Sequence, residues 1–463
     1  MTRNLDDAIA DAGRPQTLLW ESQTPATTIA GMAPEFTNWR DEQLAWRRTS
    51  VLFDQSHHMW NLNVKGPDAL KLISDTAVNS TAYFPVDAAK QYVAVNGEGN
   101  LIGDNILFRY EEDEFQAVGM AATINWLQFH AETGGYDVEL WKDAPSAMRQ
   151  GPPRVYRYEV QGPGAIEVIR EAVGQDVPSV KFFHGARMTI GGVQVRALRH
   201  GMAGEPGFEF VGPWEEREAV HEALLAAGQK HGMVQVGGRA YLTNTLESGW
   251  LPRPLPAIYT GESTAAHRRW LSDTSPDARA SLGGSFFSPD VEDYYFTPYD
   301  LDYGRIVKFD HDFIGRSALE AQVADGTAQA NKKVTLVWNR EDTAKIMGSM
   351  FDEGIGAKHM ALPLANYATY QYDRVQTEGG DYVGRSNYVG YSSNERSILS
   401  ISVVDAAHAE PGTEVVVLWG ENPASSKVQV EDHRQVAVRA TVQPAPLVAK
   451  ARSEYRSNTT ASA

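Results

Sequence analysis

The feature that most constrains the fold is a change in sequence pattern near residue 325. Before it, strand-like alternation and helix-like spacing of apolar residues follow each other, with Gly-rich breaks between them. After it, short runs rich in β-branched residues, such as KKVTLVWN, SILSISVV and TEVVVLWG, are separated by Gly, Pro and Asn. We therefore predict an α+β body at 1–325, a β-barrel domain without a helix at 326–445, and a loose polar tail at 446–463.

Composition and charge limit the functions open to this chain. Its 42 Lys and Arg residues face 59 Asp and Glu residues, a formal net charge of -17. Such a charge disfavours phosphate backbones and anionic membranes, so we expect no nucleic acid and no membrane as partner. The chain has no cysteine, which excludes disulfides, thiolate metal sites and cysteine nucleophiles. An acidic start and the lack of any run of about 18 apolar residues predict a soluble, cytoplasmic protein.

Local patterns predict several elements of the α+β body. Asn38, followed by Asp41 three residues later, marks the start of a helix that ends near Ser50. Two strand-helix units follow further along, one with its helix entered at Pro163 and one with its helix stopped at Gly228. GEGNLIG at 97–103 imitates a dinucleotide-binding loop, but it precedes a strand where that motif requires a helix.

The segment RHGMAGEPGFEF at 199–210 places Glu205 and Glu209 four residues apart across a turn. Its glycines let the backbone approach a neighbour closely, and Phe208 and Phe210 flank Glu209 in the alternation of a strand. Glu209 therefore faces the opposite side of the strand from two aromatic rings. Such a carboxylate suits a flat ligand rich in hydrogen-bond donors, and an ordinary turn closed by a solvated Glu has the same pattern.

Three further polar positions are candidates for chemistry. DQSHHM at 54–59 offers two adjacent histidines, which point to opposite faces of a strand, so we predict no metal site and one histidine that faces a pocket. Asp104 interrupts an apolar run, where an acid usually caps or turns the chain. Tyr241 follows a loop of small residues and is either a core residue or a proton donor.

These segments together resemble the glycine-cleavage T-protein family of folate-dependent aminomethyltransferases and their methyltransferase relatives. RHGMAGEPGFEF resembles R-T-G-Y-T-G-E-D-G-F-E, LFDQSHHM resembles F-D-x-S-H-M, and NGEGNLIGDNIL resembles N-x-x-G-G-I-x-D-D-L. YEVQGPGA, LESG and FIGRSAL match further family segments in the same order. The resemblance runs from roughly residue 35 to 440 and implies two α+β lobes around a central folate hollow, closed on one side by the barrel.

One branch of that family is closer: the tetrahydrofolate-dependent aryl O-demethylases, which act on vanillate, 3-O-methylgallate and similar methoxylated aromatic compounds. APEFTNWR, ALRHGMAG, NTLESGW, LPAIYTG and LPLANYA resemble this branch. The resemblance implies tetrahydrofolate as cofactor and a small methoxyaromatic substrate. The residues that it assigns to the cofactor are Glu209, Asp104, Gln55 and Trp250. Those that it assigns to catalysis are Tyr241 and His58, and those that it places against the substrate are Ile29, Met120, His58 and Trp60.

The implied reaction moves the methyl group of an aryl ether to N5 of tetrahydrofolate and releases a phenol. Glu209 would pair with the amino group and ring N–H of the pterin. A Tyr with an ordinary pKa of about 10 is close in acidity to the departing phenol, so Tyr241 can share or give a proton there. His58 would hold the phenol network or bind a ring substituent.

Two departures from the branch bear on the substrate. Met120 stands where vanillate-type enzymes have an arginine for the ring carboxylate, and Ile29 stands where they have a tyrosine. Loss of a charge-assisted partner predicts a more apolar ring, with a chlorinated ortho-methoxybenzoate such as dicamba as the first expectation and a vanillate-like acid as the second. If Met120 only packs, Arg239 is a candidate to take the carboxylate.

Other activities stay open or are disfavoured by single positions. A folate-dependent demethylase of a sulfonium or N-methyl donor would not need Tyr241 at the leaving atom. Aminomethyltransferases have A-R-D where this chain has Ala240, Tyr241 and Leu242, which disfavours that activity. Noncatalytic assembly factors of the same fold carry K-G-C-x-x-G-Q-E, which a chain without cysteine cannot have. The sequence leaves the oligomeric state open.

Overall fold

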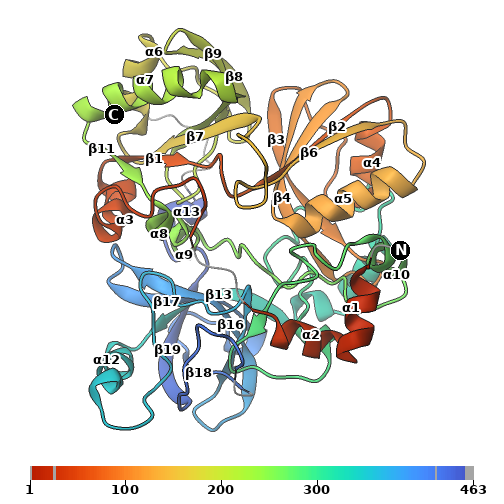
Figure 1. Cartoon of the computed structure of the whole chain (residues 1–463), viewed down its shortest axis with the longest axis vertical. Coiled ribbons are helices and arrows are strands. Elements are labelled where there is room, and N and C mark those ends of the chain that lie inside the picture. The colour runs from red at the N-terminus through yellow and green to blue at the C-terminus, as the bar shows by residue number, and fades with distance from the viewer. Residues whose placement is uncertain (1–2, 24–27, 423–424, 454–463) are drawn as a thin grey trace.

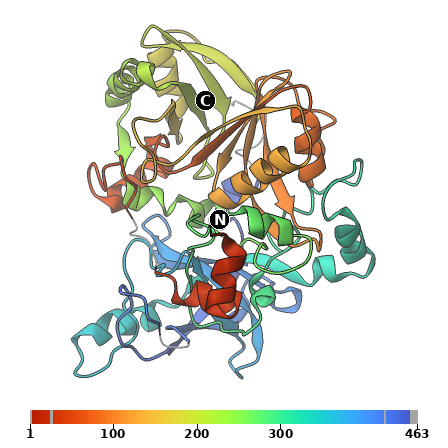
Figure 2. The ribbon, with the colours of Figure 1, turned by 45° about the vertical axis from the view of Figure 1, so that its right-hand side comes forward.

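The computed structural model describes residues 3–23, 28–422 and 425–453. Two α+β lobes lie side by side above a β-barrel (Figure 1). The turned view of Figure 2 shows the same three bodies, with the N-terminal helices beside the barrel below the second lobe. The predicted α+β class with a terminal barrel is confirmed.

The first lobe is built on a six-stranded sheet in the order β11-β1-β7-β10-β9-β8. β1 and β11 pair in parallel, and the other neighbours are antiparallel. Its strands are β1 (Ser50–Asp54), β7 (Val155–Gln161), β8 (Gly185–Ile190), β9 (Val193–Arg199), β10 (Gly207–Pro213) and β11 (Met233–Val236). Its helices are α3 (Trp39–Arg48), α6 (Ala165–Val173), η1 (Trp214–Glu216) and α7 (Arg217–Lys230).

The alternation of β7 decides which face of this sheet becomes core. Tyr156, Tyr158 and Val160 point into the apolar cluster that includes residues of α6 and α7. Arg157 and Glu159 occupy the intervening positions and point to the other face, because successive side chains of a strand alternate. Both are also buried, at 1% and 0% exposed. Two opposite charges are therefore enclosed on the face away from the helices, where they need partners.

The second lobe contains a five-stranded sheet in the order β3-β4-β5-β2-β6. Its elements are β2 (Trp60–Lys65), α4 (Ala69–Thr76), β3 (Ala88–Val95), β4 (Leu101–Glu111), β5 (Glu114–Gly119), α5 (Ala121–Thr133) and β6 (Glu139–Asp143). β3 and β4 form an antiparallel hairpin around residues 96–100, so a strand follows GEGN as predicted. The chain leaves the first lobe after β1 and enters the second at β2, so the two lobes are interleaved.

The barrel is closed, in the order β13-β17-β16-β15-β18-β19. Its strands are β13 (Asn331–Trp338), β15 (Asp373–Gln376), β16 (Tyr382–Ser392), β17 (Ser397–Asp405), β18 (Glu414–Trp419) and β19 (Val436–Pro444). The expectation that this region lacks helices is wrong. α12 (Arg340–Gly348) follows β13, and η4 (Ser349–Phe351) and η5 (Ala406–His408) are short 3-10 turns. The Asn339 side chain caps α12 by accepting from the backbone of Glu341 and Asp342, a start signal that outweighed the β-rich surroundings.

The remaining elements connect the three bodies. They are α1 (Leu5–Ala12), α2 (Pro15–Glu21), α8 (Gly238–Tyr241), α9 (Asn244–Ser248), α10 (Ala265–Trp270), β12 (Leu282–Gly283), η2 (Val291–Tyr294), α11 (Arg316–Ala324), η3 (Thr327–Gln329), β14 (Tyr370–Gln371) and α13 (Ala449–Ser453). β12 and β14 form a separate parallel pair. In the part of the chain described, no helix is long and apolar enough to cross a lipid bilayer.

Helix boundaries test three of the sequence predictions. α3 starts as predicted, since the Asn38 side chain accepts from the backbone N–H of Asp41. α6 begins at Ala165, two residues after the predicted Pro163. α7 continues past Gly228 to Lys230, so the predicted stop is wrong. A Cβ at Gly228 would collide with the Met233 side chain, so this glycine permits close packing of β11 and does not end the helix.

The tail predicted to be loose at 446–463 contains α13 in its described part. Lys450 of α13 forms an ion pair with Glu205, Nζ to Oε2 at 2.5 Å. The end of the chain therefore returns to the turn that precedes β10. Residues 454–463 lie outside the described residues.

Glu247 in α9 connects the first lobe to the barrel. Its carboxylate is 1% exposed and accepts from Trp46 Nε1 at 2.9 Å and Arg47 Nε at 2.8 Å, both on α3. From the barrel side it accepts from Ser392 Oγ at 2.5 Å and Asn394 Nδ2 at 3.1 Å. Four donors from two bodies thus meet at one buried carboxylate, which offsets the cost of burying its charge.

We expect Glu247→Ala to lower the free energy of unfolding by about 3–5 kcal/mol, because it leaves the four donors, including the Arg47 guanidinium, without their shared acceptor. Urea unfolding followed by tryptophan fluorescence measures this loss. Glu341→Ala is the matched control, since Glu341 is 82% exposed and lies 3.8 Å from Arg439. Equal effects of the two variants would contradict the role given to Glu247.

Candidate active site

Tyr241 and His58 form a hydrogen-bonded pair between two separate segments. His58 lies in the turn that follows β1, and Tyr241 is the last residue of α8. The Tyr241 hydroxyl is 3.0 Å from His58 Nε2, and the two rings meet edge to face with centroids 4.8 Å apart. Phe53 packs edge-on against the other side of Tyr241. The two rings are therefore fixed by contacts that do not depend on a ligand.

Burial keeps both members of this pair neutral. The pKa of His58 is lowered to about 4, mainly by burial; Asp54 opposes this shift, and the positive charge of Arg253 adds to it. Burial also raises the pKa of the Tyr241 phenol well above its usual value, and the charges of Glu159 and Glu209 add to this. Near neutral pH, Tyr241 thus holds its proton, and a neutral His58 that carries its own proton on Nε2 can donate to the Tyr241 oxygen. His58 Nδ1 is buried without a hydrogen-bond partner in the described part of the chain.

Two carboxylates face each other across neighbouring strands beside this pair. Glu159 on β7 and Glu209 on β10 are direct partners in the ladder, and ligand atoms of both lie within 4.8 Å of His200. Arg157 Nη1 binds Glu209 Oε1 at 2.5 Å, with its guanidinium 1% exposed. A fixed cation already neutralises Glu209, so the cluster is a poor site for a metal ion and a good one for an uncharged donor group.

The turn before β10 places Glu209 as its alternation predicted. Phe208 and Phe210 pack into the core of the first lobe, and Glu209 points to the opposite face. Gly207 is required here because a Cβ would collide with the carbonyl oxygen of Val160 on β7. Glu205 has a different role, since it is bound to α13. The two carboxylates of the segment therefore serve separate parts of the molecule.

Gln55 joins the carboxylates to the Tyr241–His58 pair. Its Nε2 donates to Glu159 Oε2 and lies 3.0 Å from the sulfur of Met202. The Tyr241 hydroxyl is 3.3 Å from the same sulfur. The backbone N–H of Met202 donates to Glu159 Oε1 at 2.8 Å. Residues far apart in the sequence thus form one continuous polar network on the inner side of the first lobe.

Asp104 lies within β4 and accepts hydrogen bonds from two other segments. Gln91 Nε2 donates to its Oδ2 at 2.7 Å, and Trp250 Nε1 donates to the same oxygen at 2.9 Å. Gln91 also donates to the Tyr303 hydroxyl at 3.0 Å. Burial raises the pKa of Asp104, and these donors oppose the rise. The expectation that Asp104 caps or turns the chain is therefore wrong, because tertiary donors satisfy it inside a strand.

A cavity of about 180 Å³ opens between the second lobe and the connecting segments. His58 is the residue that links it to the polar network of the first lobe. The residues around it that bear on function are His58, Trp60, Asp104, Met120, Arg253 and Asp277. The structure thus brings four of the predicted residues to one cavity.

The other predicted residues lie outside this lining. Ile29 packs with Met32 on the apolar cluster that contains Tyr241. The hydrogen-bonded networks described above, and not the cavity lining, contain Tyr241, Gln55, Glu209 and Trp250. Arg239 does not line the cavity either, and it binds Glu35 Oε1 at 3.1 Å and the carbonyl oxygen of Leu362 at 2.8 Å. Its guanidinium already has two acceptors, which disfavours it as the partner of a substrate carboxylate.

Four charged residues of the site were missed by the sequence predictions. Arg157 and Glu159 had a detectable signal, because they alternate with Tyr and Val in VYRYEVQ, which places both on one face of a strand. Arg253 and Asp277 had none. Both lie in irregular segments, which have no periodicity that predicts where a side chain points.

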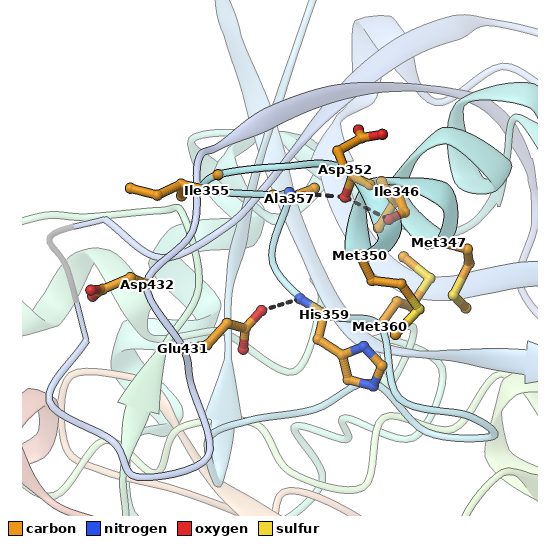
Figure 3. A pocket seen from close by; sticks show the side chains of 13 residues that line it. Ile346, Met347, Met350, Asp352, Ile355, Ala357, His359, Met360, Glu431 and Asp432 are labelled. Atoms are coloured by element: carbon orange, nitrogen blue, oxygen red, sulfur yellow. Dashed lines mark hydrogen bonds between the residues drawn. The ribbon is translucent and has the colours of Figure 1, made fainter.

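A second cavity, of about 350 Å³, lies on the outside of the barrel beside α12 (Figure 3). Its lining includes Met347, Met350, Ile355 and Met360, and Glu431, which also lines it, accepts a hydrogen bond from the backbone of His359. None of the residues identified from the family motifs lies there. The smaller cavity is therefore the candidate active site.

Residues 20–252 match the family model described as the GCVT N-terminal domain, and the chain belongs to this family. It is 46% identical to the syringate O-demethylase of a Sphingobium species, with 98% of each chain covered. It is 31% identical to the sesamin methylene transferase of a Sinomonas species, covering 84% of this chain and 86% of the relative.

A solved structure shows the same fold. The crystal structure of glycine cleavage system aminomethyltransferase T from Bartonella henselae matches with a TM-score of 0.62 at 19% identity, covering 93% of this chain and 95% of that one. The chain is accordingly an enzyme of the tetrahydrofolate-dependent O-demethylase class, a group of one-carbon methyltransferases. The predicted family, enzyme class and cofactor are confirmed.

We expect the His58 imidazole to stay neutral until the pH falls to about 4, because burial disfavours its charged form. The unfolded chain takes up this proton near pH 6.5, so stability is lost as pH falls from about 6.5 to 4, by about 3 kcal/mol for this group. Nitrogen-15 histidine NMR across pH 4–8 measures the titration, and His58→Asn identifies the resonance. A midpoint near 6.5 would contradict the neutral pair.

Proposed function

We propose that this protein transfers the methyl group of a methoxylated aromatic acid to tetrahydrofolate and releases the corresponding phenol. The observation that carries the proposal is the neutral Tyr241 hydroxyl, 3.0 Å from Nε2 of His58 at the cavity. Aryl ether cleavage places negative charge on the phenolic oxygen. A fixed, buried O–H donor is suited to stabilise that charge.

The inner side of the first lobe has groups that fit a pterin. Glu209 keeps Oε2 without a donor among the described residues, while Arg157 holds its other oxygen, so the carboxylate is oriented and able to accept. Gln161 Nε2 is buried there and has no acceptor in the part of the chain that the structure describes. Glu209, Gln55, Asp104 and Trp250 would hold tetrahydrofolate, which supplies the nucleophilic nitrogen that accepts the methyl group when it is bound.

Tyr241 acts on the departing oxygen mainly as a hydrogen-bond donor. Burial raises the pKa of its phenol well above 10, so complete transfer of its proton to a phenolate of ordinary basicity is unfavourable. A short hydrogen bond to the developing charge still lowers the barrier, since the donor is preorganised in a site shielded from water. His58 positions this donor through Nε2–H, which leaves the Tyr241 proton for the departing oxygen. Its Nδ1, which has no partner among the described residues, is free to accept from a hydroxyl substituent of the ring.

Two substrate classes compete for the cavity. The apolar Met120 favours a ring with an apolar substituent on that side, such as a chlorinated ortho-methoxybenzoate. The 46% identity to a syringate O-demethylase over almost the whole chain favours a phenolic methoxybenzoate. We propose the second class as the substrate, because near-complete coverage includes the cavity segments and one apolar contact is compatible with a methoxy group.

Purified protein with tetrahydrofolate should form methylated folate with 4-hydroxy-3,5-dimethoxybenzoate, more slowly with its monomethoxy analogue, and least with dicamba, as measured by mass spectrometry. If methylated folate forms with sulfonium or N-methyl donors and with no aryl ether, the protein is instead a demethylase of those non-aromatic donors. Equal rates for all three aryl ethers would overturn the preference for a phenolic acid.

Tyr241→Phe should lower kcat by about 100-fold or more with little change in KM, because the hydroxyl acts on charge that develops in the transition state. Steady-state kinetics with the best aryl ether measures this. Tyr92→Phe is the matched control, a fully buried tyrosine of the second lobe outside the site. Turnover by Tyr241→Phe at the wild-type rate would remove Tyr241 from the mechanism.

Glu209→Gln should weaken tetrahydrofolate binding by about 10- to 100-fold, the usual effect of losing a charge-assisted hydrogen bond. Fluorescence titration in the absence of substrate measures it. Glu205→Gln changes the carboxylate four residues away, which faces α13, and should bind like the wild type. Thermal melting of both variants is needed, since Glu209→Gln also leaves Arg157 without its anion. Matching affinities would exclude Glu209 from the folate site.

A further inference from the structure

We propose that the guanidinium of Arg253 binds the carboxylate of the aromatic substrate. This inference rests on the proposed function and names the residue that takes the acid group. Arg253 lies at the same cavity as His58, Trp60 and Met120. Its side chain is cationic, and neither the family motifs nor the strand and helix patterns assigned a role to it.

The backbone holds Arg253 in a fixed position. It lies between Pro252 and Pro254, which also line the cavity. A proline ring fixes its own φ, and the residue before a proline is kept extended by steric clash. Little backbone entropy is therefore lost when the guanidinium engages a ligand, which favours tight binding.

Arg253 has no anionic partner of its own. In residues 3–23, 28–422 and 425–453 its half-buried guanidinium forms no hydrogen bond and no ion pair. Arg157 is bound to Glu209 and Arg239 to Glu35, so the other two candidates are already neutralised. A partly desolvated guanidinium at a cavity is suited to a planar carboxylate, which it can hold through two parallel hydrogen bonds.

The second charged group at the cavity, Asp277, supports one orientation of the ring. Asp277 Oδ2 accepts from Asn125 Nδ2 at 2.7 Å, and the charge of Lys142 acts on it. No ion pair joins Asp277 to Arg253, so it does not neutralise the guanidinium. A carboxylate placed near Asp277 would meet like charge, whereas near Arg253 it meets the opposite charge. The acid group is therefore assigned to the Arg253 side and the ether to the Tyr241–His58 side.

The test compares an acid with its neutral amide. Arg253→Gln should raise KM for 4-hydroxy-3,5-dimethoxybenzoate about 10- to 100-fold, with little change for the corresponding benzamide or for tetrahydrofolate. Arg253→Lys should have a KM for the acid between those of the wild type and Arg253→Gln, because lysine keeps the charge but cannot form two parallel hydrogen bonds to a carboxylate. Arg239→Gln is the matched control and should behave like the wild type. Met120→Arg in the Arg253→Gln background should restore part of the binding of the acid, since Met120 lines the same cavity.

Three outcomes would overturn the inference. Equal loss for the acid and the amide would mean that Arg253 only shapes the cavity. A rise in KM for tetrahydrofolate without one for the acid would assign the guanidinium to the carboxylates of the folate tail. A loss of acid binding in Arg239→Gln, with none in Arg253→Gln, would assign the carboxylate to the surface arginine.

Calorimetric binding of the acid without folate separates this inference from the proposed function. If no methylated folate forms but the acid binds the wild type and not Arg253→Gln, the function fails and the carboxylate site stands. If the acid does not bind the wild type at all, the carboxylate site fails.

Discussion

The arrangement of the site depends on the hydrogen bonds that the buried carboxylate of Glu247 accepts. This carboxylate fixes α9, which stands between Tyr241 and the segment that carries Trp250 and Arg253, and it does so with donors from both α3 and the barrel. The Tyr388 hydroxyl of the barrel adds a bond of 2.6 Å to the carbonyl oxygen of Leu242. The first lobe and the barrel are thereby held together at the stretch of chain that carries Tyr241, Trp250 and Arg253.

The charged side chains of the site and its neutral Tyr241–His58 pair form two separate, adjacent groups. The first lobe gathers ionised groups on the inner face of its sheet, with Glu209 neutralised by Arg157 and Glu159 bound by Gln55. The Tyr241–His58 pair lies next to them and is kept neutral by burial. Fixed dipoles beside a small cavity stabilise developing charge without the reorganisation that water requires. This division suits a reaction in which an uncharged ether and an uncharged amine meet and the ether oxygen gains charge.

How much could be predicted from the sequence depended on whether a residue sat in a regular pattern or motif. The orientation of Glu209 followed from its place between Phe208 and Phe210, because alternation along a strand is a local property. Asp104 was recognised through a motif, but its partners Gln91 and Trp250 come from other segments, so its place inside a strand was misjudged. Gly228 shows the reverse case, since its role was set by the contact with Met233 and not by helix propensity.

By itself, the sequence determined the family, the α+β class with a terminal barrel and the cofactor, and it proposed Tyr241 and His58 as catalytic residues. Strand alternation and motif order are properties of short stretches of chain, so they can be recognised without knowing how distant segments pack. Only the tertiary structure decided that Arg239 is bound to Glu35, while Arg253 lies at the cavity without a partner among the described residues. The two arginines are alike as residues, and what distinguishes them is which other segments pack around each one and neutralise its charge.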